Sequence, residues 1–170
     1  KETFDFSFAL DNSGSMTNDI ANLEKAVTEM VSLKSPEDRM AFVKFDHRIS
    51  NMTGLSANKD SLMIAVNRIG FDSLGGSTAL YAGTYDAIIN TNNNAPNKKI
   101  IVFTDGYENS SSSYLGSKAS TGQELVDLAR EYNIPISFVS FGRGTNEKLL
   151  DMISWMTNGS FYNLRNSKQL

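Results

Sequence analysis

Apolar and polar positions alternate along the first segment of the chain. Between residues 4 and 10 every second residue is large and apolar, phenylalanine three times and then leucine, and the residues between them are small or polar. A period of two places alternate side chains on opposite faces of an extended backbone. The pattern therefore predicts a strand with one fully buried face, and it stops at Asp11.

Apolar residues recur at intervals of three and four in five later segments, which is the spacing of an amphipathic helix. Asn18 or Thr17 is placed to cap the first of these helices, and Thr121 begins a capping box for the fourth. The helices are expected over Asp19–Leu33, from Asn58 to Ile69, from Thr78 to Ile89, from Thr121 to Tyr132, and from Thr145 or Asn146 to Met156.

Apolar runs of strand length lie between these helices. The run at residues 100–103 is continuous, as expected when helices cover both faces of a parallel strand. A tight turn at residues 46–48 would join one run to a short partner strand. The further strands are expected over Met40–Phe45, Ile49–Thr53, Lys99–Gly106, Pro135–Phe141 and Ser160–Asn163.

Strands that alternate with helices in this rhythm predict an α/β fold. We expect a doubly wound, mostly parallel sheet with one short antiparallel edge strand and helices on both faces. No internal repeat or linker divides the sequence, so residues 1–170 should form a single domain. In such sheets the ligand site lies at the carboxyl ends of the strands, where the strand order reverses.

Composition narrows the range of partners. The 170 residues carry a net charge of −3 with scattered basic residues, which argues against a nucleic-acid interface, and no apolar run is long enough for membrane insertion. Cysteine is absent, which fits an extracytoplasmic bacterial protein without disulfides, although a cytosolic chain can also lack it. Because the sequence begins at Lys1 without an initiator Met, we expect a domain of a longer protein, monomeric in isolation.

Oxygen-bearing side chains follow the first strand. Asp11, Ser13 and Ser15 alternate along the chain, so in an extended or gently turning backbone they can converge on one point. Asp105 likewise ends a strand, and Thr78 opens the helix before that strand. If the two strands are neighbours, all five side chains reach one site. Oxygen donors without sulfur or imidazole suit a hard cation such as Mg²⁺.

These pieces resemble the metal-ion-dependent adhesion site of a von Willebrand factor A domain. The resemblance rests on Asp11-x-Ser13-x-Ser15, on Thr78 within residues 75–80, and on Asp105 within residues 103–106. It extends from the first strand to about residue 163, and residues 104–109 are similar to bacterial members. It implies the family's Rossmann-like fold, with a truncated last helix of which residues 167–170 would be the beginning.

The resemblance also implies a role for each site residue. Ser13 and Ser15 would ligate the cation directly, and Thr78 would ligate it directly or through water. Asp11 and Asp105 would hold the metal's waters or bind the metal. One coordination position would remain for an acidic side chain of a protein partner. The cation would be Mg²⁺, with Mn²⁺ or Ca²⁺ as the other candidates.

The function expected from this resemblance is cation-dependent protein binding in adhesion or assembly, without catalysis. Such a domain would be extracytoplasmic: at the cell surface, secreted or periplasmic. Two alternatives stay open. One is an intracellular von Willebrand factor A subunit that docks onto an AAA-type ATPase, and the other is a Mg²⁺-dependent phosphohydrolase with an aspartyl nucleophile. The second would need a charge-stabilising Lys or Arg, and none adjoins the three motif segments.

Other sites fit the sequence less well. An EF-hand loop starting at Asp11 fails because Met16 and Asn22 stand where Gly and Glu are required. No P-loop motif is present. His47, the single histidine, is expected to be a solvated turn residue. The long polar segment Tyr107–Ser120 leaves the strand that carries Asp105, and it is either a partner-contacting loop or a mobile connector.

Overall fold

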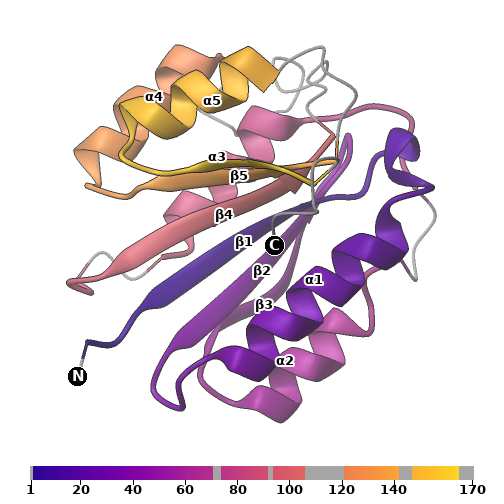
Figure 1. Ribbon diagram of the computed structural model, residues 1–170, viewed down its shortest axis with the longest axis vertical. Helices are drawn as coiled ribbons and strands as arrows, with labels where there is room; N and C mark the ends of the chain where they lie inside the picture. Colours follow the sequence, from indigo (N-terminus) through magenta and orange to yellow (C-terminus); the bar gives the residue numbers. More distant parts are fainter. Residues whose placement is uncertain (1, 71–73, 92–93, 106–120, 142–146, 165–170) are drawn as a thin grey trace.

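The computed structural model describes residues 2–70, 74–91, 94–105, 121–141 and 147–164. These residues form a six-stranded sheet in the order β3-β2-β1-β4-β5-β6 (Figure 1). The strands are β1 (Asp5–Asp11), β2 (Arg39–Phe45), β3 (Ile49–Ser56), β4 (Lys98–Thr104), β5 (Ile136–Ser140) and β6 (Phe161–Asn163). All neighbours are parallel except β2 and β3, so the predicted doubly wound sheet with one antiparallel edge strand is confirmed.

The strand order reverses at the middle of the sheet. From β1 the chain proceeds outward through β2 and β3, and it then returns to the other side of β1 as β4 before continuing to β5 and β6. β1 therefore pairs with both β2 and β4, and β1 and β4 are neighbours, as the proposed convergence of Asp11 and Asp105 requires. This is the position at which doubly wound sheets bind their ligands.

Helices pack on both faces of the sheet (Figure 1). One face carries α1 (Ile20–Leu33) and α2 (Lys59–Val66), and the other carries α3 (Leu80–Ile89), α4 (Gly122–Glu131) and α5 (Glu147–Met156). The alternation in β1 decides which residue faces which layer. Phe8 and Leu10 pack toward α1 and α2, whereas Ala9 between them belongs to the core under α3, α4 and α5.

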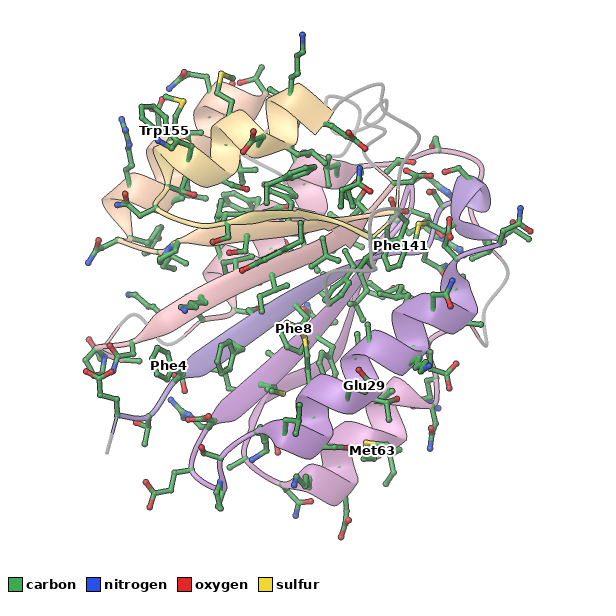
Figure 2. The ribbon with its side chains drawn as sticks, in the orientation of Figure 1. Phe4, Phe8, Glu29, Met63, Phe141 and Trp155 are labelled. Carbon is green, nitrogen blue, oxygen red and sulfur yellow. The ribbon has the colours of Figure 1, made fainter. Side chains whose placement is uncertain are left out.

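Aromatic contacts hold the central strands together on the α1 side. Phe8 lies over the middle of the sheet (Figure 2) and is 1% exposed. Its ring stacks on that of Phe42 in β2 with centroids 5.3 Å apart, and it meets the edge of Phe103 in β4 at 6.2 Å. Such pairs contribute about 0.5–1.5 kcal/mol beyond their buried area. Phe8 thus contacts both of the strands that pair with β1.

One of the expected helix caps is confirmed and one is wrong. Thr121 Oγ1 accepts a hydrogen bond from the Glu124 amide, as the capping box predicts. Asn58, at the expected start of its helix, is also an N-cap, since its Oδ1 accepts a hydrogen bond from the Ser61 amide. The first helix, however, is preceded by a 3-10 turn, η1 (Gly14–Met16), that the sequence did not predict. The Thr17 hydroxyl donates a hydrogen bond to the Gly14 carbonyl of this turn. The N-cap of α1 is Asp19, and not Asn18 or Thr17 as expected.

Element boundaries also differ elsewhere. β4 ends at Thr104, before the Asp-Gly that was expected to end it. β3 continues to Ser56, beyond the expected end at Thr53. α2 ends at Val66, before the expected Ile69. α3 begins at Leu80 with Ala79 as its N-cap, so Thr78 precedes the helix and does not open it. The caps expected at Thr145 or Asn146, the segment 107–120 and the helix start at 167–170 lie outside the described residues. No helix in the described part of the chain is long and apolar enough to cross a membrane.

The aromatic cluster generates a stability prediction. Phe8→Ala removes a fully buried ring between two strands and should lower the free energy of unfolding by about 3–5 kcal/mol. Ile64→Ala in α2 is the control, because Ile64 is 64% exposed and should change it by less than about 0.5 kcal/mol. Urea denaturation measures both. Equal losses in the two variants would contradict a core centred on β1.

Candidate metal centre

The carboxyl ends of β1 and β4 bring two acidic residues to one edge of the sheet. Leu10 pairs with Phe103, so the next residues, Asp11 and Thr104, lie side by side. The Thr104 hydroxyl donates a hydrogen bond of 2.7 Å to Asp11 Oδ2 across 93 residues of chain. Asp105 follows directly and is also buried. The sequence pattern did not single out Thr104, although it lies beside Asp105 in the strand.

Burial and a neighbouring charge both act on Asp11. Its side chain is completely buried, and this burial, together with the negative charge of Asp105, raises the pKa of Asp11 from 3.8 to about 7. Hydrogen bonds from the Ser13 amide at 2.9 Å and from Thr104 act in the opposite direction but do not cancel the effect. The charge of Asp105 disfavours the ionised Asp11 carboxyl, and a cation bound to both would relieve this repulsion.

The serines of the motif lie together at the same edge. The hydroxyl oxygens of Ser13 and Ser15 are 3.0 Å apart. Ser13 is buried and Ser15 is exposed, so the pair leads from the end of β1 to the surface. The structure therefore brings Ser13 and Ser15 to each other, and links both to Asp11 through the Ser13 amide.

The segment that carries Thr78 is fastened to this edge by its backbone. The Gly14 amide donates to the Gly75 carbonyl at 2.6 Å, and the Gly75 amide donates to the Asn12 carbonyl at 3.1 Å. The Ala79 amide donates to the carbonyl of Asp46 at 2.7 Å. Thr78 is 3% exposed and lies between these two attachments.

Asp46 is a third buried carboxylate at this edge and was not among the candidate residues. Burial alone would raise the pKa of Asp46, but hydrogen bonds from the Arg48 side chain and amide, the charge of Arg48 and a smaller contribution from His47 outweigh it and hold this pKa below its ordinary value. His47 is half-exposed, with Nδ1 3.4 Å from Asp46 Oδ1. One signal could have identified Asp46: like Asp105, it directly follows a strand that pairs in parallel with β1.

The donor set at this edge consists of oxygen atoms. The described part of the chain contains no group of three or more His, Cys, Asp or Glu side chains that could hold a metal, so any cation here would depend on hydroxyl oxygens as well as on the two carboxylates. That combination suits a hard cation that keeps some of its waters. The feature of this structure that such a cation fits is the burial of the Asp11 carboxyl beside the charge of Asp105.

Comparison with known proteins addresses the fold. The sequence profile of the von Willebrand factor type A domain matches residues 5–170. A search of curated protein sequences found no match.

Several solved structures are similar at low sequence identity. Proximal thread matrix protein 1 from the mussel byssus, in a form with a zinc-occupied MIDAS motif, has a TM-score of 0.78 at 21% identity over 99% of this chain and 43% of that chain. The structure of von Willebrand factor type A from Catenulispora acidiphila has a TM-score of 0.77 at 18% identity, over 97% of this chain and 39% of that chain. An aerotolerance-related membrane protein from Bacteroides fragilis NCTC 9343 has a TM-score of 0.71 at 16% identity, over 96% of this chain and 92% of that chain.

At these identities the structural likeness shows a common fold. The chain spans less than half of the mussel and Catenulispora chains and most of the Bacteroides chain. The family assignment depends on the profile, which covers nearly the whole sequence, and the observed sheet agrees with it. This chain therefore belongs to the von Willebrand factor type A domain family.

Proposed function

We propose that this domain binds a divalent cation at the carboxyl edge of β1 and β4 and, through it, an acidic side chain of a protein partner. The ligating residues would be Asp11, Ser13, Ser15, Thr78 and Asp105, and Mg²⁺ is the foremost cation, with Mn²⁺ and Ca²⁺ as the others. The observation that carries the proposal is the buried Asp11–Asp105 pair, in which burial and, after it, the charge of Asp105 raise the pKa of Asp11. A bound cation would supply an open coordination position for the partner's carboxylate.

Each residue of the chain has a separate part in this proposal. Asp11 and Asp105 supply the negative charge, and Thr104 orients Asp11 through its 2.7 Å hydrogen bond. The hydroxyls of Ser13 and Ser15 supply neutral oxygens, so the cation keeps a positive character that favours an incoming anion. Because Ser15 is exposed, the partner would approach from its side of the edge.

The proposal extends to where the domain acts and what its binding serves. One structural neighbour is a membrane protein and another is a matrix protein of the mussel byssus. They support an extracytoplasmic domain that serves adhesion or assembly. The alternative of an intracellular subunit docking onto an AAA-type ATPase uses the same cation site with a different partner.

Catalysis is not part of the proposal. A phosphohydrolase would need a cationic side chain free to stabilise the transferring phosphoryl group. Arg48 is a cation at this edge, but its guanidinium is bound to the Asp46 carboxylate with Nη2 2.8 Å from Oδ2. This engagement favours a binding site over a phosphoryl-transfer site.

The ligand assignment leads to a direct prediction. Asp11→Ala or Asp105→Ala should abolish Mg²⁺ binding in calorimetric titration, because each removes half of the negative charge offered by the two carboxylates. Asp151→Ala on the exposed side of α5 is the control and should bind as the wild type does. Both site variants should stay folded by circular dichroism. Undiminished binding in either one would remove that residue from the site.

The raised pKa predicts a pH dependence. Cation binding needs the ionised Asp11 carboxyl, so the Mg²⁺ affinity should fall by about tenfold per pH unit below the raised pKa of about 7, with release of a proton. The stability of the metal-free protein changes with pH in the opposite direction to the Mg²⁺ affinity: it falls as pH rises. Stability is complete below the ordinary pKa of 3.8 and is lost as pH rises through about 7, because burial disfavours the charged form.

Titrations in buffers of different ionisation enthalpy measure the proton release, and urea denaturation across pH measures the stability. Asp11→Asn should remove the pH-dependent loss of metal-free stability between pH 4 and 7. A Mg²⁺ affinity that does not change with pH would contradict the raised pKa of Asp11.

The binding role also predicts the absence of turnover. Purified domain with Mg²⁺ should not hydrolyse p-nitrophenyl phosphate above the rate of the Asp11→Asn variant. Turnover in the wild type that disappears in this variant would establish the phosphohydrolase alternative in place of the binding function.

A further inference from the structure

We propose that Asp46 is a positioning residue for the cation site: it clamps the Asp11–Ser15 segment to the segment that carries Thr78. The inference rests on the proposed function, because the two segments supply different members of the ligand set. It assigns to Asp46 no contact with the cation itself.

Asp46 contacts both segments from the end of β2. Its carbonyl accepts the Ala79 amide at 2.7 Å, next to Thr78. Its Oδ2 accepts the Asn12 side-chain amide at 3.4 Å, and Asn12 lies between Asp11 and Ser13. One residue thus reaches the backbone on one side of the site and a side chain on the other.

The amide of Asn12 depends on this contact. Asn12 is 1% exposed, and within the described residues its Oδ1 has no hydrogen-bond partner. The bond from Nδ2 to Asp46 is therefore the hydrogen bond that the described structure gives this buried amide. Removing the acceptor would leave both polar atoms of the amide unsatisfied, which disfavours the observed position of Asn12.

Gly75 is packed directly against the Asp46 carboxyl group. A Cβ at position 75 would lie 2.4 Å from Asp46 Cγ, which is far inside van der Waals contact. A glycine is needed here because the backbone of the segment runs over the side chain. The same glycine is paired with the motif through the Gly14 and Gly75 amides, so Asp46 supports the point where the two segments cross.

Arg48 fixes the Asp46 carboxylate in turn. The Arg48 amide and Nε donate to Oδ1 at 2.7 and 3.2 Å, and Nη2 donates to Oδ2 at 2.8 Å. The two residues also share a backbone bond from the Asp46 amide to the Arg48 carbonyl. With its charge matched by a guanidinium, Asp46 acts as a rigid support and not as a third anionic ligand.

A similar carboxylate–guanidinium pair, which serves as the control, lies at the opposite ends of β1 and β2, where these strands begin. Arg39 in β2 donates from Nε and Nη2 to the two oxygens of Asp5 in β1, at 2.9 and 2.7 Å. Asp5 is buried, as Asp46 is. Asp5→Asn therefore removes a carboxylate–guanidinium pair of the same kind from the end of the sheet that is remote from the site.

The test compares Mg²⁺ affinity with thermal stability in Asp46→Asn and Asp5→Asn. We expect Asp46→Asn to weaken Mg²⁺ binding by about 10- to 100-fold, the range for residues that orient metal ligands. Asp5→Asn should change it by less than about twofold, since the sites are distant. Both variants should lose a similar amount of melting temperature. An equal affinity loss in the two, or none in Asp46→Asn, would overturn the inference.

A glycine pair provides a second test that leaves Asp46 in place. Gly75→Ala drives a methyl group into the Asp46 carboxyl, whereas a Cβ at Gly76 would meet nothing within 4 Å. Mg²⁺ affinity should fall in Gly75→Ala as it does in Asp46→Asn, and it should hold in Gly76→Ala. If Gly75→Ala binds as well as Gly76→Ala, the clamp does not position the site.

Amide hydrogen exchange without metal separates this inference from the proposed function. Asp46→Asn should speed exchange at Gly14, Gly75 and Ala79, while Asp5→Asn should leave these amides protected. If wild-type protein binds no Mg²⁺, the proposed function is wrong and the positioning role is wrong with it. If the wild type binds and the exchange of these amides is unchanged in Asp46→Asn, the inference about Asp46 alone is wrong.

Discussion

The central constraint on this site is the burial of the Asp11 carboxyl beside Asp105, where β1 and β4 end together. Desolvation and like charge both disfavour its ionised form, so this part of the fold is less stable at neutral pH than it would be with neutral residues. Natural sequences retain such conflicts mainly at functional sites. The Thr104 hydroxyl and the Ser13 amide hold the Asp11 oxygens in place without removing the conflict. A cation at this edge is the simplest interaction that would resolve it.

The rest of the fold makes this burial possible. β1 lies between two parallel neighbours and under helices on both faces, so its last residue is enclosed. Phe8 contacts Phe42 of β2 and Phe103 of β4, and β1 is in register with both strands. That register sets Asp11 beside Thr104. A shift of one residue would turn the Asp11 side chain toward the opposite helix layer. The packing of the core around β1 therefore also determines the position of Asp11 at the edge of the sheet.

Much of this arrangement could be predicted from the sequence, because it follows from periodicity. Alternation in residues 4–10 and the continuous run at 100–103 identify central strands, and the acidic residue after each strand marks the edge. The 3-10 turn after Asp11 could not be predicted, since three residues show no period. Nor could the role of Asp46, which depends on contacts with Asn12 and Ala79 from segments distant in the chain.

The central claim is that Asp11 and Asp105 share a cation with the serine hydroxyls. Anomalous diffraction at the manganese edge, from crystals of the domain grown with Mn²⁺, locates such an ion directly. The account predicts one strong peak within coordination distance of the Ser13 and Ser15 hydroxyls, on the side of the two carboxylates. A manganese peak elsewhere in the molecule, or no peak at this end of β1 and β4 at saturating Mn²⁺, would contradict the claim.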